Sequence, residues 1–175
     1  TKICRPLKLV LLGHSFVPTY KKGEKGKYRL SIAKKSWQRL KQKVKIITRK
    51  TKPMSVAERI TKLKSLMYGW VNYFKYATGY QKFKNLDSWI RCRLRYCIWK
   101  AWKKPKRRYR AFLQLGIEPS WARRFAYSRK GGWAIACSPI MGVSVTEKRL
   151  RQRGYIPFLA YYLNVKYGGK LQKKV

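Results

Sequence analysis

The order of apolar and polar residues predicts a short strand-like stretch at the start of the chain. Leucines recur at every second position from residue 7 to 11, and apolar residues do the same from 28 to 32. A period of two is typical of strands, and the glycine-containing segment 22–26 is typical of a turn. We therefore predict a β-hairpin within residues 7–33. Two strands alone are only marginally stable in water, so another element must cover its apolar face.

From about Lys34 the apolar period changes to three and four residues, which is typical of a helix that ends before Pro53. Its apolar stripe is formed by Trp37, Leu40, Val44 and Ile47. The opposite face carries cations, with Lys35, Arg39, Lys43, Arg49 and Lys50 as candidate phosphate ligands. No acid interrupts this stretch. A solvated charged face normally mixes both signs, so the pattern favours phosphate binding over simple solvation.

A second helix is predicted to start at Ser55, with Glu58 three residues later as in a capping box. Its apolar stripe is Ile60, Leu63, Met67, Trp70 and Phe74. Tyr73 and Tyr76 lie off that stripe, beside the candidate ligand Lys62, where they could stack on bases or pack against another element. Gly69 costs about 1 kcal/mol relative to Ala inside a helix, and we interpret it as a site of close helix-to-helix approach.

The third predicted helix runs from about Leu86 to Trp102, with Ile90, Leu94 and Ile98 on its core side. Its other side interleaves Trp89, Cys92, Tyr96 and Trp99 with the candidate ligands Arg93, Arg95, Lys100 and Lys103, and Arg91 is a further candidate ligand on this helix. Aromatic rings among cations suit unpaired RNA, because bases stack on the rings while the cations meet phosphates. Packing of Tyr96 and Trp99 against the C-terminal region is an equally good interpretation.

A very basic segment follows, and Pro105 within it marks a predicted boundary between subdomains. Its candidate nucleic-acid ligands are Lys104, Lys106, Arg107, Arg108 and Arg110, followed by Arg123, Arg124, Arg129 and Lys130. The remaining elements are predicted to be short, including a strand over residues 133–137. The predicted fold is thus mainly α: an N-terminal β-hairpin, a three-helix bundle, and a small, mixed, mostly helical basic subdomain.

The charge balance narrows the class of function. The chain of 175 residues has 45 Lys and Arg against 5 Asp and Glu, a formal net charge of +40 at pH 7. So many positive charges repel one another in a compact fold. We therefore expect the chain to bind a polyanionic partner, and nucleic acid is the first candidate. The longest uncharged run, residues 131–146, contains glycines and a proline, so we expect no membrane span and no membrane partner.

The acidic residues argue against a catalytic centre. They are spread along the sequence, at Glu24, Glu58, Asp87, Glu118 and Glu147. Metal-dependent nucleases and polymerases hold their ions with clustered carboxylates. One histidine, His14, and four cysteines without a CxxC pair make a zinc site improbable. We predict no catalytic residue, metal or cofactor in this chain. Because no signal peptide is recognised, we expect reduced cysteines and a protein that is not secreted but lies in a bacterial cytoplasm, near the nucleoid, or in an organelle.

Three blocks of sequence resemble a known family. They are Leu66-Met67-Tyr68-Gly69-Trp70-Val71-Asn72-Tyr73-Phe74, Leu86-Asp87-Ser88-Trp89-Ile90-Arg91-Cys92-Arg93-Leu94-Arg95, and Trp99-Lys100-Ala101-Trp102-Lys103. Together they strongly resemble the maturase-specific region of group II intron reverse transcriptases, which are RNA-directed DNA polymerases of retroelements. Further on, Leu115-Gly116-Ile117 and the run from Ala126 to Trp133 resemble that family's small DNA-binding segment.

The resemblance implies a division of the chain. Residues 1–33 would be the edge of the polymerase palm, 34–103 the thumb or X domain, and 104–175 the DNA-binding subdomain with a basic tail. Where the family usually has FLGF, this chain has Leu-Leu-Gly-His-Ser-Phe at 11–16, which leaves the packing around His14 open. The family's fingers and the palm with its YADD motif are absent from this sequence, so the chain resembles a truncated maturase.

The resemblance also implies the partners. Group II intron RNA comes first, bound to promote splicing; target DNA or an RNA–DNA duplex, and a separately supplied reverse transcriptase palm, are further candidates. The alternatives are the thumb of an active reverse transcriptase whose catalytic palm lies elsewhere, and a general basic architectural RNA-binding protein. The last explains the charge but not the GW-x-NYF and WIR motifs.

Overall fold

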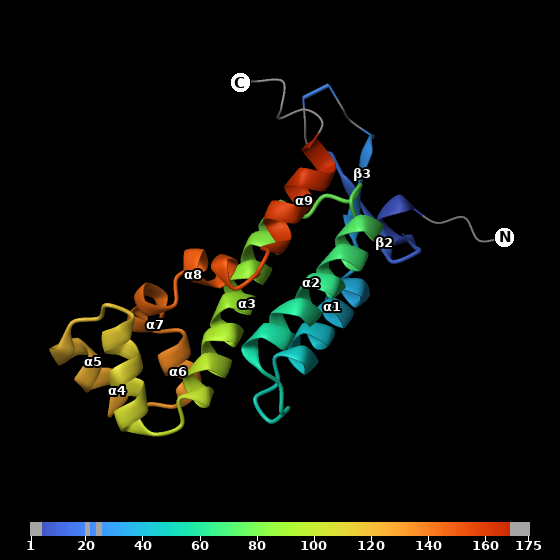
Figure 1. The fold of residues 1–175 in the computed structure, drawn as a ribbon. Helices are drawn as coiled ribbons and strands as arrows, with labels where there is room; N and C mark the ends of the chain where they lie inside the picture. Colours follow the sequence, from blue (N-terminus) through green and yellow to red (C-terminus); the bar gives the residue numbers. More distant parts are fainter. Residues whose placement is uncertain (1–4, 20–21, 24–25, 169–175) are drawn as a thin grey trace.

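The structure is a computed structural model that describes residues 5–19, 22–23 and 26–168. A small sheet at the N-terminal end packs beside a bundle of long helices, the short helices of residues 105–144 gather at the far end of the longest one, and the last helix lies along its near end (Figure 1). The prediction of a mainly α fold is confirmed. In the described part of the chain, none of the helices has the length and apolar character needed to cross a bilayer.

The N-terminal sheet has three antiparallel strands in the order β1 (Val10–Leu11), β2 (His14–Pro18) and β3 (Tyr28–Ile32). The hairpin pairs β2 with β3, His14 lying opposite Ile32, so the predicted pairing partner at residues 7–11 is wrong. Part of that segment is a 3₁₀ turn, η1 (Pro6–Lys8). Leu12 and Gly13 have φ of 48° and 77° and reverse the chain just after β1, which leaves the next residues to form the long strand.

Three long helices follow: α1 (Lys34–Ile47), α2 (Val56–Tyr73) and α3 (Tyr80–Ala101). The capping box that starts α2 is confirmed, because the Glu58 amide donates to Ser55 Oγ at 3.1 Å and the Ser55 amide to Glu58 Oε2 at 2.7 Å. Helix α3 begins earlier than predicted. Phe83 is fully buried and lies on the same stripe as Leu86, so the apolar period extends back before the predicted start.

The short helices are α4 (Pro105–Gln114), α5 (Pro119–Ala126), α6 (Gly132–Ala136), α7 (Pro139–Ser144), α8 (Glu147–Gln152) and α9 (Phe158–Tyr167). The predicted strand at 133–137 is wrong, since this segment is α6 and its neighbouring residues Ile135 and Ala136 are both buried rather than alternating. Helix α6 packs closely on α3: a Cβ added to Gly132 would come within 3.0 Å of the Tyr96 ring.

One apolar core joins these elements. Of the predicted core residues, the structure buries Leu40, Val44, Ile60, Leu63, Met67, Phe74, Ile90, Leu94 and Ile98, while Trp37, Ile47 and Trp70 are half-buried against them. The buried cluster continues into the short helices through Phe112 and Phe158. Gly69 is exposed, and a Cβ there would meet no atom within 4 Å, so the predicted close helix approach at Gly69 is wrong.

Candidate nucleic-acid interface

The acids of the described residues all lie at helix N-termini. Glu58 closes the capping box of α2, and Glu118 caps α5 by accepting from the Ser120 and Trp121 amides at 3.0 Å each. Glu147 is the first residue of α8, and Asp87 accepts from the first amides of α9. A helix N-terminus carries partial positive charge, so carboxylates stabilise it. The few described acids therefore lie at helix N-termini, and only Glu147 among them also pairs with cations, so most described cations have no carboxylate partner.

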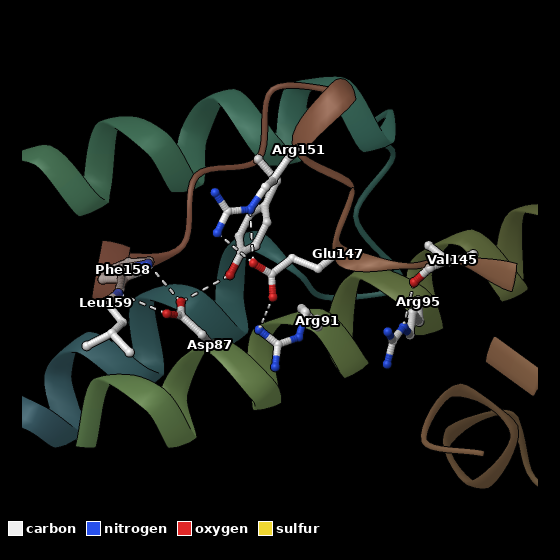
Figure 2. Close-up of polar contacts among 9 residues, drawn as sticks. Asp87, Arg91, Arg95, Val145, Glu147, Arg151, Phe158 and Leu159 are labelled. Carbon is white, nitrogen blue, oxygen red and sulfur yellow. Dashed lines mark hydrogen bonds and ion pairs between the residues drawn. The ribbon is translucent and has the colours of Figure 1, made fainter. Parts of the chain in front are cut away.

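Asp87 ties α3 to α9 from a buried position (Figure 2). It accepts hydrogen bonds from the Phe158 amide at 2.8 Å, the Leu159 amide at 2.9 Å and the Tyr155 hydroxyl at 3.1 Å. Burial raises the pKa of Asp87, while the amide bonds oppose that rise, and burial together with the Asp87 charge raises the pKa of Tyr155. Among the described residues, no three His, Cys, Asp or Glu side chains gather as a metal site.

Glu147 fixes the start of α8 to α3. Its carboxylate pairs with Arg91 at 2.9 Å and with Arg151 at 2.7 Å, as Figure 2 shows. Nearby, Arg95 Nε donates to the Val145 carbonyl at 3.0 Å. Arg91 and Arg95 are half-buried, so these candidate nucleic-acid ligands have internal partners and hold the C-terminal helices in place.

Arg93 and Arg108 are also engaged inside the protein. The Arg93 guanidinium donates to Thr48 Oγ1 and to the Lys45 and Thr48 carbonyls, at 3.2 and 3.3 Å, and thereby joins α3 to the end of α1. Arg108 lies 4.2 Å from the centre of the Trp99 ring, and burial lowers the pKa of this guanidinium. Both are half-buried.

The other candidate ligands point to solvent. These exposed cations are Lys35, Arg39, Lys43, Arg49, Lys50, Lys62, Lys100, Lys103, Lys104, Lys106, Arg107, Arg110, Arg123, Arg124, Arg129 and Lys130. Among the described residues, the ion pairs found are those of Glu147, so none of these side chains is paired with a carboxylate. Their charge is available to an external anion.

Some of the exposed cations line grooves of the surface. A groove of about 710 Å³ beside the start of α4 is lined by Trp102 and by Lys103, Lys104, Lys106, Arg107 and Arg110. Lys103 has a φ of 39°, which turns the chain sharply between α3 and α4. Two further grooves flank α1, with Arg39 and Lys43 in the first and Lys45, Arg49 and Lys50 in the second.

The four aromatic candidates for base stacking differ in accessibility. Tyr73 and Tyr76 are 55% and 75% exposed, and Tyr96 is half-buried with its ring edge-on to Trp133 at 5.8 Å. Trp99 is only 2% exposed, packed among Trp102, Phe112 and Arg108. The prediction that Trp99 offers a stacking platform is therefore wrong, and the packing interpretation holds for it.

Sequence analysis missed two arginines that organise the backbone. Arg59 is 3% exposed and donates to the carbonyls of Ile47 at 2.6 Å, Arg49 at 3.0 Å, Lys52 at 2.6 Å and Met54 at 3.3 Å. Arg149 donates to the Ser144 carbonyl and, at 3.0 Å, to the Leu115 carbonyl. A signal existed for Arg59, which stands four residues before Leu63 on the apolar stripe of α2.

A surface with many exposed cations that have no carboxylate partner is typical of proteins that bind polyanions. Residues 37–116 match the sequence model of the family described as "Group II intron, maturase-specific domain". Residues 37–116 therefore form a group II intron maturase-specific domain, which confirms the resemblance found in the motifs of this stretch, while the resemblance of residues 126–133 to a DNA-binding segment stays a prediction. The matched stretch continues past residue 104 into α4. No curated protein matched the chain.

Proposed function

We propose that this chain binds the folded RNA of a group II intron and holds it in its splicing-active form, while the RNA performs the transesterifications. The observation that carries the proposal is the division of charge: the described acids lie at helix N-termini, and the exposed cations along α1 and at the start of α4 form no ion pair with any of them. Where RNA domains converge, phosphates repel one another, and cations from the protein offset that repulsion.

The family match supports intron RNA as the particular polyanion. The matched stretch contains α2 and α3, whose surfaces border the grooves beside α1, and it reaches the groove beside α4. The same surfaces would serve for target DNA or a template–primer duplex, since the phosphate backbone supplies the attraction in each case. Our proposal places intron RNA first and includes DNA engagement as a second use of the same cations.

A salt titration of RNA binding tests the proposal. If about eight phosphates are neutralised, a plot of log K against log salt has a slope of about −6 to −7, depending on strandedness. We expect this slope for a group II intron transcript, with tighter binding than to a length-matched random transcript. A slope shallower than about −2 together with equal affinity for the two transcripts would refute the proposal.

A second candidate function is the thumb of a reverse transcriptase whose palm is supplied separately. The exposed apolar residues at the sheet favour it, because Val10, Leu11 and Leu12 are 61%, 58% and 75% exposed. Adding a separately produced palm to the chain in a primer-extension reaction tests this candidate. DNA synthesis that depends on both components supports it, and synthesis by the palm alone at an unchanged rate excludes it.

A further inference from the structure

An apolar residue stands among the exposed cations of α1. Ile46 is apolar and 55% exposed, whereas the exposed residues near it on α1, Lys45 and Arg49, are charged. Gln42 is also exposed and lies four residues before Ile46, on the same helix face. We call Gln42 and Ile46 the α1 ridge. Burial in the protein's own core does not account for this ridge, because Leu40 and Val44 fill that role.

The first groove lies on one side of the α1 ridge and has a volume of about 590 Å³. Its wall includes Tyr73 from α2 and Leu12 from the turn after β1. The Tyr73 hydroxyl donates to the Leu12 carbonyl at 2.9 Å, its ring lies edge-on to Phe74 with centres 4.7 Å apart, and the His14 ring stacks on it with centres 5.7 Å apart, which leaves one face for a base. These contacts hold the exposed Tyr73 ring in one orientation, with Arg39 and Lys43 on the same groove.

The second groove lies between the end of α1 and α3 and has a volume of about 460 Å³. Tyr96 supplies its aromatic wall, and Lys45, Arg49 and Lys50 supply charge. The guanidinium of Arg93, fixed by backbone carbonyls at the end of α1, forms part of the same wall. Gln42 and Ile46 line both grooves, so the two grooves meet at the α1 ridge, and each also contains one tyrosine and several cations.

The composition of the two grooves selects the kind of ligand. Each combines a tyrosine, the apolar Ile46 side chain and at least two cations, and neither is lined by a carboxylate. Nucleobases stack on aromatic rings while their phosphates meet cations, so this combination fits unpaired nucleotides. A base-paired duplex presents its backbone rather than its base faces, so it would not use the tyrosines.

We propose that the α1 ridge and its two grooves bind a single-stranded segment of RNA, with one unpaired base on the Tyr73 side and another on the Tyr96 side. Ile46 separates the two bases, and the cations at the groove rims bind the phosphates of the segment. This inference rests on the proposed RNA-binding function. It adds that the bundle recognises unpaired nucleotides, rather than phosphate charge alone.

Fluorescence of a single-stranded RNA oligonucleotide carrying 2-aminopurine tests the inference with the full chain. A base lodged against tyrosine is quenched, so we expect quenching on binding at certain positions, and none when the complementary strand is annealed first. Stacking of one base is worth about 1–3 kcal/mol. Tyr96→Leu or Tyr73→Leu should therefore weaken single-strand binding about five- to 150-fold, while duplex affinity and the salt slope stay unchanged.

The controls separate lost stacking from lost folding. Tyr96→Phe and Tyr73→Phe keep the ring and should retain single-strand affinity within about two-fold, although the latter loses its bond to Leu12. Tyr127→Leu is the matched control, because Tyr127 is 52% exposed and lines neither groove. It should bind as the wild type does. Thermal melting of each variant shows whether it is folded at the assay temperature.

Several outcomes overturn the inference. Wild-type protein that binds the oligonucleotide without quenching at any position has no base site, whatever the variants do. Equal losses for single-stranded and duplex RNA in the leucine variants assign the tyrosines to backbone contacts. Displacement of the oligonucleotide by an acidic peptide, with the same dependence on Tyr96, assigns the grooves to protein binding. If the wild type still binds the intron transcript more tightly than a random transcript in these cases, the proposed function stands. If the wild type shows no such preference and a shallow salt slope, the proposed function is refuted separately.

Discussion

Replacing Arg59 with Met tests how the basic loop between α1 and α2 is held. Arg59 is buried, and its guanidinium donates to four backbone carbonyls between Ile47 and Met54. A hydrogen bond to a charged group contributes about 1.5–3 kcal/mol, but the carbonyls partly regain water when the side chain is removed. An acceptor that stays buried without a partner costs about 1–3 kcal/mol, and some of the four carbonyls regain water, so we expect a total loss of about 3–5 kcal/mol.

A loss of this size is a large part of the stability of a typical domain, about 5–15 kcal/mol. Arg59→Lys keeps the charge but cannot reach four carbonyls with one ammonium group, so we expect it to lose the equivalent of about one charged hydrogen bond, about 1.5–3 kcal/mol. Lys62→Met on the same helix is the matched control, because Lys62 is exposed, and its effect should lie within about 0.5 kcal/mol.

Urea unfolding followed by circular dichroism at 222 nm measures the free energy of unfolding of the wild type and of the three variants. Because Arg59 also orders the carbonyls of Arg49 and Lys52, the folded Arg59→Lys protein should bind RNA more weakly than the wild type, although it has lost no charge. An Arg59→Met protein whose free energy of unfolding lies within about 0.5 kcal/mol of the wild type would refute this account of the loop.

Three further predictions concern stability, pH and charge. Gly69→Ala should raise the free energy of unfolding by about 1 kcal/mol, because Gly69 is exposed within α2 and has open space for a Cβ; a decrease in urea unfolding would contradict this. Burial raises the pKa of Asp87 in the folded protein, so its stabilising contribution is present below its unfolded pKa and is lost as pH rises through the folded value. The difference in free energy of unfolding between wild type and Asp87→Asn should therefore shrink as pH rises from about 4, and a difference that grows would show the opposite shift. Replacing Lys106 and Arg107 together with Gln should reduce the magnitude of the salt slope by about 2 if both contact phosphates, and an unchanged slope would remove the groove beside α4 from the interface.

The long helices could be predicted from sequence because local signals and tertiary packing agree there. The apolar stripe of α2 coincides with its buried face, and its capping box stands where the sequence places it. The sheet was harder to predict, because the alternation of leucines at 7–11 does not distinguish one long strand from a 3₁₀ turn followed by a two-residue strand that ends before the left-handed Leu12. Short helices such as α6 depend on packing against α3, and five residues carry little helical period.

The candidate site was predictable in its charge but not in the role of each residue. The sequence identifies where cations are dense, yet it cannot separate Arg91 or Arg93, which bond within the protein, from exposed Arg39 on a similar pattern. Trp99 could not be assigned from sequence for the same reason, since it is buried because α4 folds back on α3 and places Phe112 against it. Which side chains have internal partners depends on contacts between residues far apart in the chain.

The most direct test of the central claim is a splicing reaction with a group II intron precursor at a magnesium concentration too low for the RNA to react alone. We predict that the purified chain restores splicing in proportion to the RNA it binds. A precursor with an inactivated catalytic RNA core should stay intact in the same mixture. Splicing at the same rate with and without the protein, or cleavage of the inactivated precursor by the protein, would contradict the claim that this cationic fold holds an RNA that performs the chemistry itself.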